Sequence, residues 1–207
     1  MKIESKIPLS RPNNRPPLLS PQFVLLLAIT VLFGLSFSTY FLLPKFLDVE
    51  LAASASTIGS ISAVAWFASV ICVPFVGVQV DRHGRKLFAI LGALLFALSS
   101  AGFLWVDSVG PLIWVLRVFQ GFAFTAFYVS VSTLSADISP PARLAQAIGT
   151  YGAVMISTNA IGPAIAEWIA DHYGWSSVFV FTIVAAGLAT VLTLFIPEKR
   201  KAHAREH

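Results

Sequence analysis

Six long apolar segments follow one another along this chain of 207 residues and constrain its fold more than any other feature. A helix that crosses a lipid bilayer needs about 20 predominantly apolar residues. The segments that reach this length cover residues 23–44, 57–80, 87–106, 111–136, 142–168 and 175–196. The connections between them are too short to hold a soluble domain. The pattern predicts an all-α polytopic membrane protein with six transmembrane helices over residues 23–196.

The composition agrees with a chain that lies in a lipid bilayer. Hydrophobic residues make up 57% of it and charged residues 12%, whereas soluble domains carry about 25% charged residues. Basic residues do not alternate with aromatic ones as in nucleic-acid surfaces, so no nucleic-acid partner is expected. The sequence has no H-E-x-x-H zinc pair, no G-x-S-x-G elbow and no Walker loop. We therefore predict that the protein is not an enzyme and holds no metal or cofactor.

Charged residues outside the apolar segments indicate an orientation. Residues 1–22 form a polar, Pro-rich tail and residues 197–207 a basic one. Lys and Arg accumulate on the cytoplasmic side of membrane proteins. If both tails lie on the cytoplasmic side, the alternation of spans also places Arg82, Arg85, Lys86 and Arg143 there. The residues on the other side are then Lys45, Asp48, Glu50, Asp107 and Asp171. We predict an integral protein of the cell (inner or plasma) membrane with both termini cytoplasmic.

Two turns resemble each other at corresponding places in the two halves of the chain. The second span is followed by Asp81-Arg-His-Gly84 and the fifth by Asp171-His-Tyr-Gly174. If spans one to three and four to six are repeats, these turns are equivalent but lie on opposite sides of the membrane. This arrangement is typical of an inverted three-plus-three repeat. Asp and Gly are also ordinary turn residues, which leaves a chance likeness open.

Four motifs in order resemble a known family. Gly77–Lys86 fits the loop G-x-x-x-D-R-x-G-R-K between spans two and three, and Arg117-Val-Phe-Gln-Gly121 is similar to an R-x-x-Q-G motif in span four. Residues 137–143 resemble the loop that follows span four. Gly162-Pro163 in span five and Gly174-Trp175 at the start of span six resemble the remaining part of the same pattern. Together they resemble the amino-terminal six-helix half of a major facilitator superfamily transporter.

The resemblance implies a secondary active transporter of a small solute, coupled to protons, with efflux favoured over uptake. The sequence Gly162-Pro-Ala-Ile-Ala-Glu167 departs from the G-P-x-x-G-G of drug antiporters. Transporters of this family have two six-span halves, so a second half, either a copy of this chain or a separately encoded one, is expected as a partner besides the lipid bilayer, the substrate and protons. The alternative is a truncated or non-transporting membrane protein that needs a second half.

The loop after span two is the first candidate site. Arg85 and Lys86 stand at the start of a helix, where its dipole disfavours cations, and therefore call for nearby acids. Asp81 precedes Arg85 by one helical turn, and Asp137 lies on the same side of the membrane. The sequence predicts an Asp81–Arg85–Asp137 cluster, and the resemblance implies that it gates access. Solvated loop charges are the alternative. The proposed gating residues are Gly77 (a close helix contact), Gly84 (a left-handed turn), Asp81, Arg82, Arg85, Lys86 and Asp137.

The second candidate site consists of polar residues inside the spans. A charge within a span by default marks function, so Arg117 and the neighbouring Gln120 are expected to face a cavity or a partner. The resemblance implies that Arg117 contacts substrate or supports proton coupling. An Arg that reaches the outer surface is the alternative. The resemblance also implies that Ser36, Thr39 and Tyr40 line the cavity, although Ser and Thr hydroxyls can bind their own helix instead.

Span five offers three further features. Glu167 is either a coupling carboxyl or, as we favour, an acid at the membrane interface, since it stands near the end of the span. Ala145, Gly149, Ala153 and Ser157 form a small-residue stripe that permits close helix contact. The resemblance implies that this stripe faces the other half, with packing within this half as the alternative. Gly162 and Pro163 predict a helix kink, with plain packing as the alternative.

Overall fold

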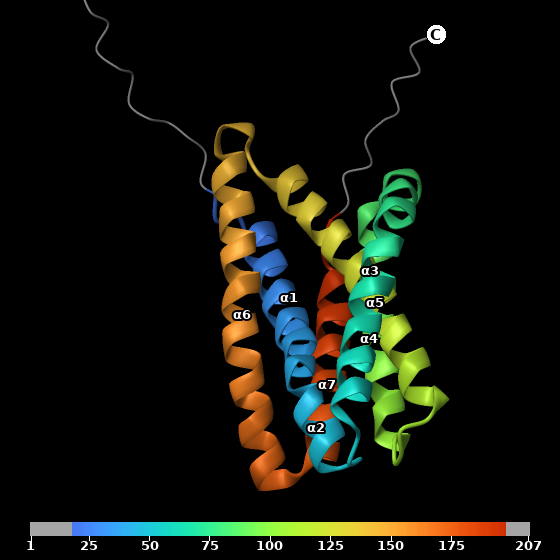
Figure 1. The fold of residues 1–207 in the computed structure, drawn as a ribbon. Helices are drawn as coiled ribbons and strands as arrows, with labels where there is room; N and C mark the ends of the chain where they lie inside the picture. Colours follow the sequence, from blue (N-terminus) through green and yellow to red (C-terminus); the bar gives the residue numbers. More distant parts are fainter. Residues whose placement is uncertain (1–17, 198–207) are drawn as a thin grey trace, which may run out of the picture.

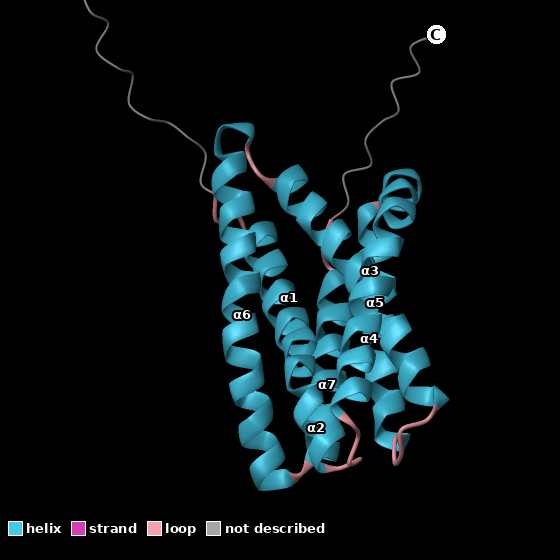
Figure 2. Ribbon diagram, in the orientation of Figure 1, coloured by secondary structure: helices cyan, strands magenta, loops and turns pink. Residues whose placement is uncertain are grey.

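The computed structural model describes residues 18–197. The predicted tails fall mostly on residues 1–17 and 198–207, outside the described part. The elements are α1 (Pro21–Ser38), η1 (Thr39–Leu42), α2 (Leu43–Val49), α3 (Ala55–His83), α4 (Arg85–Gly102), η2 (Phe103–Trp105), α5 (Pro111–Ile138), η3 (Pro141–Arg143), α6 (Leu144–Tyr173) and α7 (Trp175–Thr193). Within the described residues, six helical stretches are long and apolar enough to cross a membrane, and short loops join them (Figure 2).

The first span is longer than the sequence suggested. It begins at Pro21, where the Ser20 hydroxyl caps the helix by accepting a hydrogen bond from the Phe23 N–H at 3.2 Å. The span continues through η1 and α2 to Val49, beyond the predicted end at residue 44. Pro44 stands in the first turn of α2, where a helix N–H has no partner to lose. Proline therefore does not end the span.

The packing pattern shows an inverted repeat. The helix α3 packs chiefly against α5, and α6 packs chiefly against α1, while α4 and α7 contact each other and also α5 and α1 respectively. Exchanging α1 with α5, α3 with α6 and α4 with α7 reproduces the same set of contacts. In Figure 1, α1 and α6 lie side by side on one side of the bundle and α3, α4 and α5 on the other. The predicted three-plus-three architecture is confirmed.

The two resembling turns occupy equivalent places in the repeat. Gly84 joins α3 to α4 and Gly174 joins α6 to α7, with φ of 102° and 78°. Each glycine N–H closes its helix by donating to the carbonyl four residues earlier, at 3.1 Å to Val80 and 2.9 Å to Ala170. A φ in this range is one that only glycine adopts readily. We call the end of the bundle with Gly84 the loop end and the end with Gly174 the opposite end.

Substituting Gly174 tests the need for this backbone. Gly174→Ala is expected to lower the free energy of unfolding by about 1–3 kcal/mol, the usual cost of a side chain in a sparsely populated φ/ψ region. Nothing lies within 4 Å of the Cβ that alanine would add, so the effect reports backbone strain alone. Chemical unfolding in detergent, followed by circular dichroism, measures it. An unchanged midpoint would contradict the argument.

The core of the bundle is aromatic. Phe33 of α1 stacks on Phe127 of α5 with ring centroids 3.7 Å apart and meets Phe96 of α4 edge-on at 5.2 Å. A glycine, Gly92, lets α4 approach the α5 backbone closely: an added Cβ would stand 2.6 Å from the Phe127 nitrogen. Rings and close backbones together hold the first, third and fourth spans in contact.

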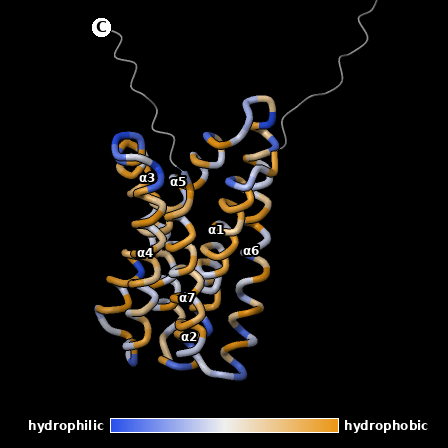
Figure 3. Tube along the Cα trace, turned by 180° about the vertical axis from the view of Figure 1, so that it is seen from behind, coloured by the Kyte–Doolittle hydropathy of each residue, from blue (hydrophilic) through white to orange (hydrophobic). Residues whose placement is uncertain are grey.

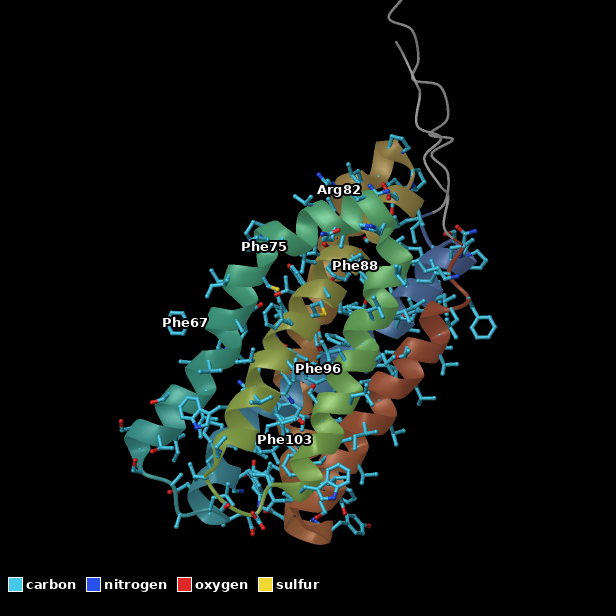
Figure 4. The ribbon with its side chains drawn as sticks, turned by 90° about the vertical axis from the view of Figure 1, so that its right-hand side faces the viewer. Phe67, Phe75, Arg82, Phe88, Phe96 and Phe103 are labelled. Carbon is cyan, nitrogen blue, oxygen red and sulfur yellow. The ribbon has the colours of Figure 1, made fainter. Side chains whose placement is uncertain are left out.

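The outer surface of the bundle matches a membrane environment. Phe67 and Phe75 project away from α3 and are 67% and 69% exposed (Figure 4). Polar residues gather toward the two ends of the bundle, and apolar ones dominate between them (Figure 3). An exposed apolar surface of this kind is stable in contact with lipid tails. The chain is a multi-pass membrane protein.

Candidate functional site

A buried guanidinium lies at the centre of the candidate site. Arg117 and Gln120 stand one turn apart on α5 and are 7% and 1% exposed. Arg117 donates from Nη1 to Gln120 Oε1 at 2.7 Å. Its Nε and Nη2 donate to the backbone carbonyls of Ile61 and Ser62 on α3, both at 3.3 Å. Arg117 therefore points into the bundle, and the alternative of an Arg that reaches the outer surface does not hold.

Arg117 borders a cavity of about 160 Å³ between the first span, α3 and α5. Five of its twelve lining residues are aromatic, and Ser62 and Ser69 are its small polar groups. Phe37 and Phe124 stack with centroids 4.2 Å apart, and Trp66 meets both edge-on at 5.8 and 6.0 Å. The cavity thus combines one cation with an apolar wall.

Of the three residues predicted in span one, only Tyr40 lines this cavity. Its ring centroid lies 5.9 Å from Arg117 Cζ. Its hydroxyl is buried near Ser100, Thr182 and Gln120 but forms no hydrogen bond of ordinary geometry.

The two smaller hydroxyls of span one bind backbone carbonyls instead. Ser36 donates to the Thr182 carbonyl on α7 at 2.9 Å, and Thr39 donates to Leu35 in its own helix at the same distance. Neither residue borders the cavity. Their placement in the cavity is corrected: these hydroxyls satisfy backbone groups.

No carboxylate of residues 18–197 forms an ion pair with Arg117. Within that range, carbonyl oxygens accept its hydrogen bonds and the face of the Tyr40 ring lies near its charge. A buried cation without a counter-ion is costly, and such charges in membrane proteins mark substrate or ion paths. The cavity is therefore positive and suited to contact a group that carries negative charge.

At the loop end, Arg85 lies between two carboxylates. Its Nη2 is 3.6 Å from Asp81 Oδ1 and its Nη1 is 3.4 Å from Asp137 Oδ2, so the cluster predicted from the sequence forms. Lys86 donates to the Leu194 carbonyl just after α7, at 2.7 Å. Arg82 is exposed. Nothing within 4 Å faces Gly77, so the close helix contact expected there is absent from the described bundle.

A second ionic cluster lies at the opposite end. Lys45 Nζ is 2.7 Å from Glu167 Oε1 and 3.7 Å from Asp171 Oδ1. It joins the end of the first span to the turn between α6 and α7, just as Asp137 joins the end of α5 to the turn between α3 and α4. Glu167 is half-exposed and does not border the cavity. Its pairing with Lys45 at this end of the bundle agrees with the favoured prediction of an interfacial acid and does not support the coupling carboxyl.

The two ionic clusters are expected to differ in strength. Arg85 is only 16% exposed and contacts two acids. Arg85→Gln should therefore lower the free energy of unfolding by on the order of 1–2 kcal/mol. This figure includes a partial gain, because removing a cation from the start of a helix removes an unfavourable interaction with the helix dipole. Lys45→Gln should have the smaller effect, because exposed ion pairs contribute little and are screened by salt. Unfolding midpoints at low and high salt measure both. Equal effects, or a Lys45 effect that salt leaves intact, would contradict this ranking.

The helix α6 contacts α1 through Gly162. A Cβ at Gly162 would collide with the Ser38 side chain and stand 3.3 Å from the Leu35 carbonyl, so plain packing accounts for this glycine. The helix is continuous through Pro163, and the kink predicted there stays a prediction.

The small-residue stripe of α6 does not pack within this bundle. Ala145, Gly149, Ala153 and Ser157 are exposed, and nothing lies within 4 Å of the Cβ that alanine would add at Gly149. The stripe thus stays open on the surface of the described bundle.

A family model for the Major Facilitator Superfamily matches residues 24–207. The chain belongs to the major facilitator superfamily. Among curated members, it is 30% identical to multidrug resistance protein 2 of Bacillus subtilis over 165 residues, which are 80% of this chain and 40% of that protein. It is also 30% identical over 128 residues to a homologue of the multi-drug resistance efflux pump PmrA from Lactococcus lactis, covering 62% of this chain and 31% of that one.

Solved structures of the superfamily share the fold. The inward-open xylose transporter XylE from E. coli superposes with a TM-score of 0.73 at 17% identity, over 86% of this chain and 47% of that one. The chain spans less than half the length of the relatives it matches. Its helices correspond to a partial superfamily domain, consistent with one six-helix half.

The contribution of α3 to the cavity was missed from the sequence. Ser62, Trp66 and Ser69 follow one another at helical spacing on one face of α3, and all three border the cavity. Ser69 also shares a 2.6 Å hydrogen bond with the hydroxyl of Thr125 on α5. A polar and aromatic stripe within an apolar span was the available signal.

Proposed function

We propose that this chain forms one half of a proton-coupled secondary transporter that exports a small solute across the cell membrane. The observation that carries the proposal is that Arg117 is buried beside Gln120 at a cavity with aromatic walls and forms no ion pair with any residue of 18–197. A structural bundle gains little from a costly internal cation, whereas a transport path uses one. Export rather than uptake is supported by the efflux and multidrug-resistance names of the related proteins.

Proton coupling requires a group that can release a proton. The guanidinium keeps its proton in proteins, so in this proposal Arg117 does not carry the proton itself. It instead favours the charged form of an acid that approaches it, either on the substrate or on the second half. Protonation of that acid weakens its attraction to Arg117 and releases it.

The Arg85 cluster is proposed to hold one access state. It ties the α3–α4 turn to the end of α5, while Lys86 reaches the end of α7. Movement of the half against a partner would have to break these contacts. The same end carries Arg82, Arg85, Lys86 and Arg143, which favours a cytoplasmic location for it and for both termini.

The proposed partner is a second six-helix half. Alternating access requires two bundles that rock around a central site. The exposed stripe of α6 and the open surface at Gly77 of α3 offer places where a second backbone can approach closely. A second copy of this chain or a separately encoded half would fill the role.

The test combines oligomeric state with flux. The purified chain is placed in lipid nanodiscs for mass measurement, then in liposomes loaded with ethidium or carboxyfluorescein under an imposed proton gradient. We expect a dimer with gradient-dependent dye flux that Arg117→Ala abolishes. A monomer that moves neither dye would contradict transport by this chain alone. It would leave a non-transporting protein or one that needs a different second half.

A further inference from the structure

We propose that the Arg117 cavity selects a substrate with a carboxylate, or a similarly acidic group, attached to a single aromatic ring. The inference rests on the proposed function for the role of the cavity as a substrate site. It goes further by assigning the charge and shape of the molecule that the cavity accepts.

The first support is the unused hydrogen-bonding capacity of Arg117. A guanidinium has five N–H donors and no acceptor. Three atoms of Arg117 donate to Ile61, Ser62 and Gln120, all of them neutral acceptors. Two N–H groups have no hydrogen-bond partner among the described residues, the positive charge has no counter-ion there, and Arg117 borders the cavity. A carboxylate matches such a planar donor set better than any neutral group does.

The second support comes from the amide of Gln120. Arg117 Nη1 donates to Gln120 Oε1 at 2.7 Å. If the Gln120 amide were flipped, its NH₂ group would face the Arg117 N–H, and two donors would oppose each other. The Nε2 group is thereby fixed as a donor, and it is buried without a hydrogen-bond partner. Gln120 borders the cavity together with Arg117. Both buried polar side chains therefore offer donors, and an acceptor-rich ligand satisfies both.

The third support is the shape of the apolar part. Phe37 and Phe124 stack, and Trp66 packs edge-on against the pair while remaining half-exposed. The cavity measures about 160 Å³, and an apolar cavity of about 150 Å³ can hold benzene. One aromatic ring therefore fits the space.

Aromatic walls also attract cations, which is the main competing interpretation. Ring faces draw cations by their quadrupole, but that attraction is weaker than the repulsion from a full positive charge at close range in a poorly solvated site. No carboxylate of the described residues neutralises Arg117. A cationic ligand is therefore disfavoured where an anionic one is attracted.

Three ligands that share a fluorinated ring and carry a negative, a neutral or a positive substituent test the proposal. Binding of 4-fluorobenzoate, 4-fluorobenzamide and 4-fluorobenzylammonium to the chain in phosphatidylcholine nanodiscs is followed by fluorine NMR at neutral pH, with empty nanodiscs as the partition control. We expect the benzoate to bind at least about tenfold more tightly than the other two, the effect of one hydrogen bond to a charged group. Equal binding of all three, or tighter binding of the ammonium, would overturn the proposal.

Variants show whether Arg117 causes the preference. Arg117→Gln should make the benzoate and the benzamide bind alike, whereas Arg117→Lys should keep part of the preference. His172→Gln, an exposed residue of α6 outside the cavity lining, should keep all of it. A preference that survives Arg117→Gln would contradict the assignment. If a variant misfolds, the ranking of ligands on the unmodified chain still decides. A preference for benzoate without dye flux would contradict the proposed transport function but not this inference. Dye flux without the preference would contradict this inference but not the transport function.

Discussion

Replacing Gly121 with alanine is expected to push α3 and α5 apart and to lower the free energy of unfolding by about 3 kcal/mol, the upper part of the range for overpacked interiors. The added Cβ would collide with the Ala65 carbonyl and stand 2.8 Å from the Ala68 Cβ and 3.1 Å from the Ser69 nitrogen. Two of these atoms belong to the α3 backbone, which cannot rotate away as a side chain would. Relief therefore requires a shift of the whole helix.

Gly187→Ala on α7 is the matched control. Nothing lies within 4 Å of its added Cβ, and alanine favours a helix over glycine by up to about 1 kcal/mol, so this variant should be neutral or more stable. Unfolding in detergent, followed by circular dichroism, compares the two. Equal midpoints for Gly121→Ala and Gly187→Ala would show that α3 and α5 do not approach as closely as described.

The Gly121 substitution also connects packing to the site. Gly121 borders the cavity and follows Gln120 directly. Separation of α3 from α5 would move the Ile61 and Ser62 carbonyls away from Arg117. The glycine of the R-x-x-Q-G motif thus has a physical role: it brings the acceptors on α3 within reach of the arginine.

The number of spans and their repeat followed from the sequence because both depend on local chemistry. Apolar length fixes which segments can cross a bilayer, and the positive φ of Gly84 and Gly174 explains why a glycine recurs at both turns. The Arg85 cluster was equally accessible, since a cation at the start of a helix requires nearby acids. Each of these inferences needed only neighbouring residues or a shared side of the membrane.

The orientation of polar side chains inside the bundle was less predictable. Ser36 and Thr39 bind carbonyls, and the choice between that and the cavity depends on which face of α1 meets α7. Glu167 finds its partner in Lys45, far away in the chain, through contact of the spans at the opposite end. Helix rotation and long-range pairing decide these contacts, and a hydropathy pattern carries no information on either.

Replacing Arg117 with methionine is expected to separate function from stability. Methionine has a similar length and is apolar, so it removes a buried charge that has no counter-ion in the described residues. The Ile61 and Ser62 carbonyls lie within the continuous helix α3 and do not depend on Arg117 for a partner. Exchange of buried ionic groups for apolar ones is often neutral or stabilising by about 1–4 kcal/mol. We therefore expect an unchanged or higher unfolding midpoint.

The same substitution should reduce the flux of the anionic dye carboxyfluorescein on the order of 100-fold, because removing one partner of a buried charge contact typically costs 2–5 kcal/mol of binding. Arg117→Lys, which keeps the charge but not the planar donor set, should fall between the methionine variant and the unmodified chain. Flux and unfolding are measured on the same preparations. A midpoint that drops sharply in Arg117→Met would assign Arg117 to the joining of α3 and α5. A stable variant without flux would assign it to transport, because functional residues are often kept at a cost in stability.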